Sequence, residues 1–290
     1  MGIFSKKPTF IKTLIDNLTI NNYLNNFNRY FEVIEATNNK QKEEAYKLRY
    51  DIYIKENGYN NENKKLDEIE KDIYDERSII HLLYHKPTGS IAGTARIILP
   101  DINNFNNSFP LQKYCDHPYL EIEDNYKNLC QISRLCMSHK FRKRPMDGRF
   151  LPDYYDQDFA INNGSKLIYI NRKVPYAPLG LIGAVFKSAI NKGKTNCIWA
   201  LEREQLRIMR KLGILYRTLG PRINYHGKKQ PFIFNIKHVL DNMINENPAG
   251  AEIIGNKGEL IKKVNQLEHN KWHDELFNDK CMDLIFNKIK

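Results

Sequence analysis

Three arginines stand inside short apolar segments of the sequence, and this setting restricts what they can do. They are Arg49 in Leu-Arg-Tyr, Arg96 in Ala-Arg-Ile and Arg134 in Ser-Arg-Leu. A guanidinium buried alone is costly, so each needs a carboxylate, a hydrogen-bonded network or an anionic ligand. Asp72 and Asp75 lie between the first two arginines, three positions apart. The set predicts a cluster that can hold a carboxylate or phosphate through paired arginine bonds.

Hydrophobic periodicity indicates the elements that must position these side chains. Strands are predicted over residues 30–36, 79–84, 91–98, 129–137, 196–200 and 232–234, and helices over 41–56, 179–190 and 202–211. Lys86-Pro87-Thr88-Gly89 is a turn that joins the second and third strands as a hairpin. The predicted elements combine a β-hairpin with alternating strands and helices. This pattern predicts an α/β (α+β) layered domain.

The chain length fits one large domain with terminal additions. With 290 residues and 41% hydrophobic content, it can bury a full core. We expect the domain over residues 30–247, an N-terminal helical extension over 1–29 and a charged helical extension over 248–290. Residues 151–177 lack clear periodicity and are expected to form a long loop or insertion.

The net charge of +11 predicts attraction to an anionic partner, which can be nucleic acid, a membrane surface or an acidic protein. No nucleic-acid motif or aromatic basic patch is present, so nucleic acid is not expected. Five cysteines without regular spacing indicate a reducing compartment, and the eight histidines have no metal-ligand spacing, so no metal is expected.

No stretch is long and apolar enough to span a bilayer, and the N-terminus lacks the apolar core of a secretory signal. A cytoplasmic protein is expected. The N-terminal residues Phe10, Ile11, Leu14, Ile15 and Leu18 have helical spacing beside lysines. Such a segment packs on its own domain or lies on a membrane surface, so a peripheral membrane contact stays open.

Several short motifs follow one another along the chain in a specific order. They are Leu48–Tyr53 with Tyr59 following, Asp72–Asp75, Gly93–Arg96 and Ile132–Arg134, and later Pro178–Leu181, Gly220–Pro221 and Tyr225–Pro231. In the order of the first four motifs the chain resembles acyl-homoserine lactone (autoinducer) synthases and N-acyl amino acid synthases. It resembles more closely the acyltransferases associated with the PEP-CTERM/exosortase system, whose later part is similar to the last three motifs. The likeness covers roughly residues 30 to 245.

The resemblance implies a GNAT-like acyl-CoA N-acyltransferase fold, in which helices flank a central mixed sheet. Two neighbouring parallel strands would splay and admit the pantetheine arm of an acyl thioester, with the strand around Arg134 and the strand 196–200 beside that arm. The implied reaction moves a fatty-acyl group to the amine of an amino acid or related small metabolite. No bound cofactor is implied, because acyl carrier protein (acyl-ACP) or acyl-CoA serves as co-substrate.

Acyl transfer to an amine needs a positioned thioester, donors for the developing oxyanion and a route for the amine proton. Unpaired backbone N–H groups on a splayed strand can supply the donors. The resemblance assigns catalytic positions to Arg134, Gln131, Ser133, Asp72 and Asp75, and substrate-binding positions to Arg49, Tyr53, Tyr59 and Arg96. The charged residues can instead hold an N-terminal lobe together by ion pairs, and the two tyrosines can be core aromatics.

Gln131 departs from the related synthases, which carry a glutamate at this position, three residues before the arginine of Ser-Arg. A glutamine cannot take a proton at neutral pH. The proton can then leave through water or through Asp72 or Asp75, or the reaction can differ from the one that the resemblance implies. His226 lies in Tyr-His-Gly-Lys-Lys-Gln-Pro, whose Gly and Pro predict a turn between two strands, and it can be an acid, a base or a loop-stabilising residue.

The pyrophosphate loop of GNAT enzymes, Gln/Arg-x-x-Gly-x-Gly/Ala, is missing, which weakens the expectation of a coenzyme A donor. A basic run replaces it, and Arg142, Lys143 and Arg144 suit an acidic acyl carrier protein and its phosphopantetheine. The run can also be a solvated face. Two alternatives remain: a lactone-forming synthase that uses S-adenosylmethionine, and a non-catalytic basic module that binds nucleic acid or membrane.

Overall fold

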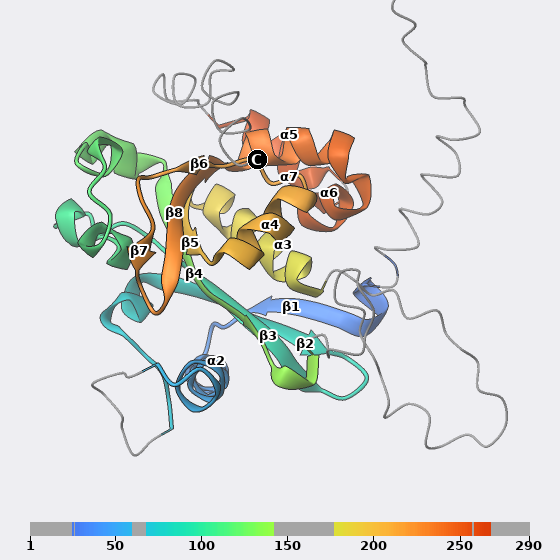
Figure 1. The fold of residues 1–290 in the computed structure, drawn as a ribbon. Coiled ribbons are helices and arrows are strands. Elements are labelled where there is room, and N and C mark those ends of the chain that lie inside the picture. The colour runs from blue at the N-terminus through green and yellow to red at the C-terminus, as the bar shows by residue number, and fades with distance from the viewer. Residues whose placement is uncertain (1–24, 26, 60–67, 142–176, 257, 268–290) are drawn as a thin grey trace, which may run out of the picture.

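The computed structural model describes residues 25, 27–59, 68–141, 177–256 and 258–267. In these ranges the chain forms one mixed sheet in the order β1-β2-β3-β4-β5-β8-β6, with β7 paired to β8. The strands are β1 Phe31–Glu35, β2 Ser78–His85, β3 Ser90–Ile98, β4 Leu129–Met137, β5 Asn196–Leu201, β6 Arg217–Thr218, β7 Ile223–Asn224 and β8 Lys228–Asn235. The predicted α/β class is confirmed, because helices flank a mixed sheet (Figure 1).

Helices cover both faces of the sheet (Figure 1). They are α2 Asn39–Arg49, α3 Ala177–Asn191, α4 Arg203–Lys211, α5 Ile236–Glu246, α6 Pro248–Gly255 and α7 Glu259–Asn265. The main apolar core joins the sheet to α3 through α7, and a smaller one lies beneath α2 on the opposite face. The helices α6 and α7, within the range expected as a C-terminal extension, bury Ile253, Ile254, Leu260 and Val264 in the main core.

The helix α2 begins and ends differently from its predicted range. It begins at an asparagine cap, because Asn38 accepts a hydrogen bond from Gln41 N and the Gln41 side chain accepts from the Asn38 backbone. At Tyr50 it widens into a π-helix that runs to Glu56. Single π-helical turns within α-helices are frequent at functional sites. Here the widened turn carries Tyr53 towards β4.

The asparagine-rich segment between β3 and β4 was expected only as a loop. It folds into four short 3₁₀ turns, Phe105–Asn107, Pro110–Lys113, Pro118–Leu120 and Glu123–Lys127. Their buried side chains, among them Phe109, Leu111 and Tyr126, form a second core with Leu129 and Ile198 of the sheet. This core fixes the segment against the face of the sheet that also carries α2.

Strands β4 and β5 are the parallel neighbours of the sheet, and their pairing is short. Leu129 pairs with Asn196, Cys130 with Cys197 and Gln131 with Ile198, and no further pairs follow. β4 continues for six more residues, Ile132 to Met137, paired on its other side with β3. The predicted splay of this pair is therefore confirmed, and it begins directly after Gln131.

Some sequence-based expectations lie outside the described residues. These are the N-terminal apolar segment from Phe10 to Leu18, the basic run with Arg142, Lys143 and Arg144, and the 151–177 insertion except for Ala177. Within the described ranges, no helix is both long and apolar enough to cross a membrane.

Gly93, in the Gly-Thr-Ala-Arg motif of β3, has a steric role. A Cβ atom built there would lie 2.8 Å from the Cys136 carbonyl oxygen, 2.6 Å from Met137 Sδ and 3.1 Å from Leu181 Cδ1 of α3. Because a carbonyl of the neighbouring strand cannot swing aside as a side chain does, only glycine fits without a backbone shift.

We expect Gly93→Ala to lower the free energy of unfolding by about 1–3 kcal/mol through overpacking. Gly255→Ala is the matched control, since the nearest atom to its added Cβ is Leu240 Cδ2 at 4.0 Å. The control should change stability by less than about 1 kcal/mol. Urea denaturation of both variants measures the difference, and equal stabilities would contradict the steric role.

Candidate active site

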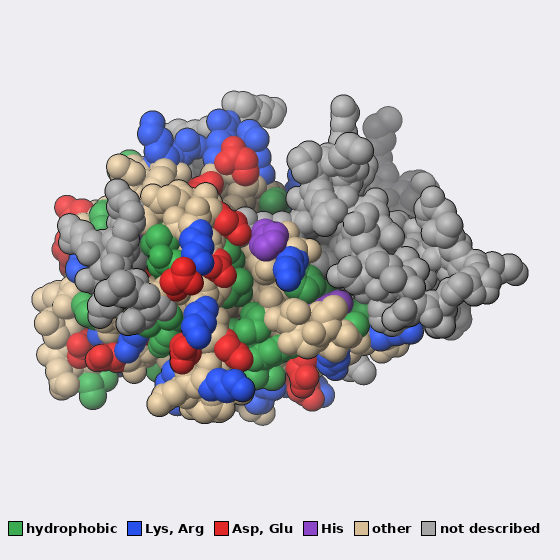
Figure 2. All heavy atoms as spheres, turned by 90° about the horizontal axis from the view of Figure 1, so that it is seen from below, with side chains coloured by type: hydrophobic (Ala, Val, Ile, Leu, Met, Phe, Trp, Pro, Cys, Tyr) green, Lys and Arg blue, Asp and Glu red, His purple; other side chains and the backbone are tan. Residues whose placement is uncertain are grey.

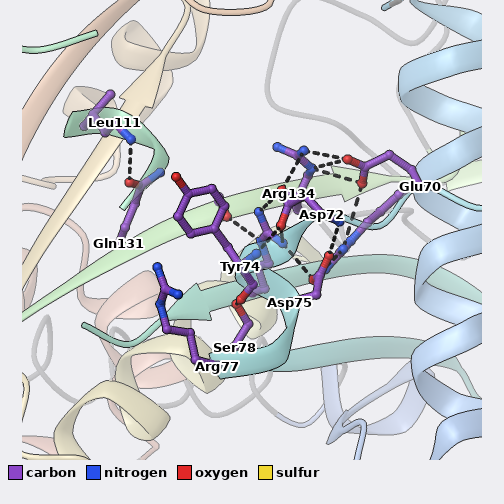
Figure 3. Close-up of polar contacts among 12 residues, drawn as sticks. Glu70, Asp72, Tyr74, Asp75, Arg77, Ser78, Leu111, Gln131 and Arg134 are labelled. Atoms are coloured by element: carbon purple, nitrogen blue, oxygen red, sulfur yellow. Dashed lines mark hydrogen bonds and ion pairs between the residues drawn. The ribbon is translucent and has the colours of Figure 1, made fainter. Parts of the chain in front are cut away.

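The 3₁₀ turn Ile73–Arg77 carries two of the predicted site carboxylates, and its own capping fixes their direction. Asp72 Oδ1 accepts a hydrogen bond from Tyr74 N at 3.0 Å, and Asp75 Oδ2 accepts one from Asp72 N at 3.0 Å. Asp-x-x-Asp therefore acts as a capping box. One oxygen of each carboxylate is used locally, and both carboxylates also face the arginines (Figure 3).

Arg96 of β3 is fully buried and bonds both aspartates. Its Nη1 and Nη2 donate to Asp72 Oδ1 and Oδ2, each at 2.7 Å, which is a bidentate pair. Nη1 also lies 2.7 Å from Asp75 Oδ1. Its Nε donates to Ser133 Oγ at 2.8 Å. The predicted site residue Ser133 thus fixes the Arg96 side chain across the β3–β4 pair.

Arg49, at the end of α2, is also fully buried. Its Nη1 donates to Asp75 Oδ1 at 2.8 Å and lies 3.9 Å from Glu70 Oε2. Its guanidinium carbon lies 5.2 Å from the centre of the Tyr46 ring, a cation–π distance. Arg49 therefore connects α2 to the capped turn.

Arg134 completes the cluster from β4 and pairs with a residue that the sequence analysis did not single out. Its Nε donates to both oxygens of Glu70 at 3.0 Å, and its Nη2 lies 3.2 Å from Asp72 Oδ2. Glu70 is only 2% exposed. A signal existed, because three buried arginines call for three carboxylates and Glu70 lies two residues before Asp72.

The cluster is electrically balanced, with three guanidinium groups against Glu70, Asp72 and Asp75 (Figure 3). Burial opposes ionisation of Asp72, but hydrogen bonds and charge from Arg96 hold its pKa well below the usual range. The pKa values of Glu70 and Asp75 are also lowered, because nearby arginines outweigh burial.

Two consequences follow for the sequence-based expectations. Arg96 and Arg134, expected to grip an external carboxylate or phosphate, are occupied by the chain's own carboxylates, whereas the buried Nε and Nη2 of Arg49 have no hydrogen-bond partner among the described residues. Asp72 and Asp75 are held ionised by their partners, so neither is an effective proton acceptor at neutral pH.

Gln131 is buried at the point where β4 leaves β5, apart from the arginines. Its Oε1 accepts a hydrogen bond from Leu111 N at 3.1 Å. Figure 3 shows its side chain directed towards Leu111, with Tyr74 between it and Arg134. The structure therefore places Gln131 beside the asparagine-rich segment, where it anchors the second core to β4.

Arg134 has an unusual backbone, with a φ of 54°. The β3–β4 register shifts there, since Thr94 pairs with Cys136 but Arg96 pairs with Ser133. One residue of β3 thus faces two of β4, which is a β-bulge. Left-handed backbone in a non-glycine residue costs free energy and often occurs at functional sites. Here the bulge lies on the part of β4 that has left β5.

The two predicted tyrosines form an aromatic wall next to Arg134. The Arg134 guanidinium lies 5.5 Å from the Tyr53 ring centre, and Tyr53 stacks on Tyr59 at 5.9 Å. Burial raises the pKa of Tyr53 well above its usual value, so it is a neutral phenol. The hairpin between β7 and β8 continues the wall, because His226 packs on Tyr59 at 5.1 Å.

Charges of both signs mix on the face that carries α2. Figure 2 views the molecule from this side and shows acidic and basic side chains next to one another over the described residues. No group of three or more histidine, cysteine or acidic side chains among the described residues is arranged to hold a metal ion.

One family model matches part of the chain. Residues 48–150 match the acetyltransferase (GNAT) domain family, over a range that includes Arg49, Asp72, Arg96 and Arg134. A search of curated protein sequences finds no significant match.

Several acyl-transferring synthases are among the solved structures with a similar arrangement. One is the CoA-dependent acyl-homoserine lactone synthase BjaI with S-adenosylmethionine and isopentyl-CoA, at 15% identity and a TM-score of 0.48, covering 79% of this chain and 88% of that one. FeeM, an N-acyl amino acid synthase from uncultured soil microbes, has 11% identity and a TM-score of 0.48, covering 74% and 95%. The acyl-homoserine lactone synthase LasI has 14% identity and a TM-score of 0.48, covering 76% and 95%. At these values the likenesses carry no conclusion about substrate.

The balanced cluster predicts a large effect of one uncharged substitution. Asp75→Asn removes the ionic partner of Arg49 and one partner of Arg96, and we expect a loss of about 3–5 kcal/mol in the free energy of unfolding. Glu76→Gln, at the exposed neighbouring position, should change it by no more than about 0.5 kcal/mol. Urea denaturation at pH 7 measures both, and a loss below about 1 kcal/mol for Asp75→Asn would contradict this reading.

The mixed sheet and the match over residues 48–150 show a GNAT-like fold, and the matched acetyltransferase domain supports an N-acyltransferase.

Proposed function

We propose that the protein transfers a fatty-acyl group from acyl carrier protein or coenzyme A to the amine of an amino acid or a related small metabolite. The observation that carries the proposal is the splay of β4 and β5 after the Gln131–Ile198 pair. Beyond that pair, β4 backbone groups on the side of β5 have no ladder partner in β5. An acyl thioester lying there would take hydrogen bonds from them, as a strand would.

The bulge supports the position of the reacting carbonyl. At Arg134 the strand turns through a left-handed residue, so its N–H groups leave the regular ladder. Backbone donors held in place by the rest of a sheet stabilise a developing oxyanion without having to reorganise. We place the thioester carbonyl at this bulge, close to the Arg134 guanidinium.

The charged cluster then has a positioning role. Arg134 is held by Glu70 and Asp72, and Arg96 joins Asp72 to Ser133. These bonds fix β4 at its bulge against the capped turn and β3. On this proposal Arg49, Arg96, Asp72 and Asp75 act on the reaction by shaping the site.

The setting of the reaction is also part of the proposal. Free thiols at Cys115, Cys130, Cys136 and Cys197 suit a reducing cytoplasm. The relation to the PEP-CTERM/exosortase-associated acyltransferases is supported by the order of motifs along the chain.

Purified protein incubated with long-chain acyl carrier protein or acyl-CoA and a pool of amino acids should release free thiol and form an amide. Thiol titration and mass spectrometry measure the two products. Omitting S-adenosylmethionine should leave the yield unchanged, whereas dependence on it would indicate the lactone-forming reaction. No thiol release above background with any acyl length would sink the proposal.

The donor can be identified through the basic run. Replacing Arg142, Lys143 and Arg144 by alanine should raise the KM for acyl carrier protein on the order of tenfold, because the acidic carrier loses its attraction. The KM for acyl-pantetheine, which lacks the acidic protein, is the control and should stay within about twofold. Salt near 1 M should remove the difference between wild type and variant, because the Debye length falls to about 3 Å. Equal KM values of wild type and variant for acyl carrier protein at low salt would argue against the carrier protein as the acyl donor.

A further inference from the structure

The proposed reaction lacks a proton acceptor among the residues of the charged cluster and at Gln131. The attacking amine must lose a proton as it forms the amide. Glu70, Asp72 and Asp75 are ion-paired with lowered pKa values, and the Gln131 amide cannot take a proton. A residue with an accessible basic nitrogen near Arg134 would complete the site.

His226 lies at the tip of the hairpin between β7 and β8. It has a left-handed φ of 49°, followed by Gly227 at 94°, and Tyr225 N donates to the Gly227 carbonyl at 2.9 Å to close the tip. The strand β8 pairs with β5 up to Leu201, the last residue of β5, opposite Gln230. The tip therefore extends past the end of β5, on the side where β4 has already left it.

Ring contacts connect His226 to the bulge of β4. The imidazole lies 5.1 Å from the Tyr59 ring centre, Tyr59 stacks on Tyr53 at 5.9 Å, and Tyr53 lies 5.5 Å from the Arg134 guanidinium. Two of the four non-glycine residues with positive φ among the described residues, Arg134 and His226, are thus brought to one place from distant parts of the sequence.

The imidazole has the form that a base needs. Among the described residues, neither of its ring nitrogens has a hydrogen-bond partner. Burial and the charges of Arg134 and Lys229 lower its pKa, while Glu70 and Asp72 act in the opposite sense more weakly. The ring is consequently neutral at pH 7 and can accept a proton.

Lys229 adds to this electrostatic setting. Its Nζ lies 5.9 Å from the Tyr59 ring centre and 5.6 Å from that of Tyr225, and no described carboxylate lies within ion-pair distance of it. Burial lowers its own pKa, and so does the charge of Arg134, while the carboxylate of Glu202 acts in the opposite sense. An acceptor ammonium bound between Lys229 and Arg134 would feel two cations and release its proton more readily.

We propose that His226 is the catalytic base that takes the proton of the attacking amine. In the step, the amine nitrogen bonds to the thioester carbonyl carbon and the carbon–sulfur bond breaks. One amine proton moves to the imidazole, and the imidazolium then gives this proton to the departing thiolate, which leaves as the thiol. The inference rests on the proposed acyl transfer. It assigns to His226 the role of proton acceptor, which the Gln131 amide cannot perform.

The test is His226→Asn, because asparagine tolerates left-handed backbone and has no titrating nitrogen. We expect kcat at pH 7 to fall about 10²- to 10⁴-fold with little change in the KM of the acyl donor. Wild-type kcat/KM should decline as pH falls through the lowered pKa of His226, since protonation removes the base, and the variant should lose this decline. Lys228→Gln, exposed on the same hairpin, is the control and should stay within about twofold.

A structural role of His226 predicts a different result. If the hairpin only needs its shape, His226→Gly should keep the rate and the pH profile, because glycine fits the left-handed position without strain. This second variant also serves if His226→Asn does not fold. If either variant folds, keeps kcat within threefold of wild type and keeps the decline of kcat/KM at low pH, the role of His226 is overturned. The proposed acyl transfer would still stand. A wild type that releases no thiol overturns the proposed function as well.

Discussion

Three guanidinium groups share three carboxylates inside this protein, and the local geometry depends on that balance. Each ion would cost several kcal/mol to bury alone. Together they are neutral, and they join four parts of the chain that are far apart in sequence: the end of α2 through Arg49, the capped turn through Asp72 and Asp75, β3 through Arg96 and β4 through Arg134. Removing one charged side chain leaves a buried charge without a partner, so the stability of the four segments is coupled.

The network also determines which chemistry is open to the site. Because its carboxylates are held ionised by arginines, they act as structural anions and make poor bases. Because Arg134 is anchored to Glu70, the bulge of β4 is fixed where β4 separates from β5. Proton transfer then needs a group outside the network, and the hairpin tip with His226 supplies an uncharged nitrogen next to it.

Two cores hold this arrangement from opposite faces of the sheet. The larger one, with α3 through α7, supports the strands from one side. The second core, formed by the 3₁₀ turns, packs on the other face and reaches β4 through the bond from Leu111 N to Gln131. Gln131, expected as a catalytic residue on the resemblance, thereby joins the asparagine-rich segment to the last paired residue before the splay.

Much of the fold was predictable from sequence, because strand and helix periodicity is local. The hairpin of β2 and β3, the buried strand β4 and the helix α3 follow from apolar spacing and from turn residues such as Pro87 and Gly89. The buried arginines were also visible, since a charge inside an apolar run is a local pattern. Asp72 and Asp75 could be named as their partners because they lie close by in sequence.

What the sequence could not determine are choices made between distant segments. It gave no reason to pair Arg134 with Glu70 rather than Asp75, because ion-pair partners depend on distances set by packing. It could not place His226 against Tyr59, which lies on the other side of the site and 167 positions earlier in the chain. The sequence by itself determined which groups are buried and charged, and the tertiary structure decided which of them neutralise one another and which nitrogen stays free for chemistry.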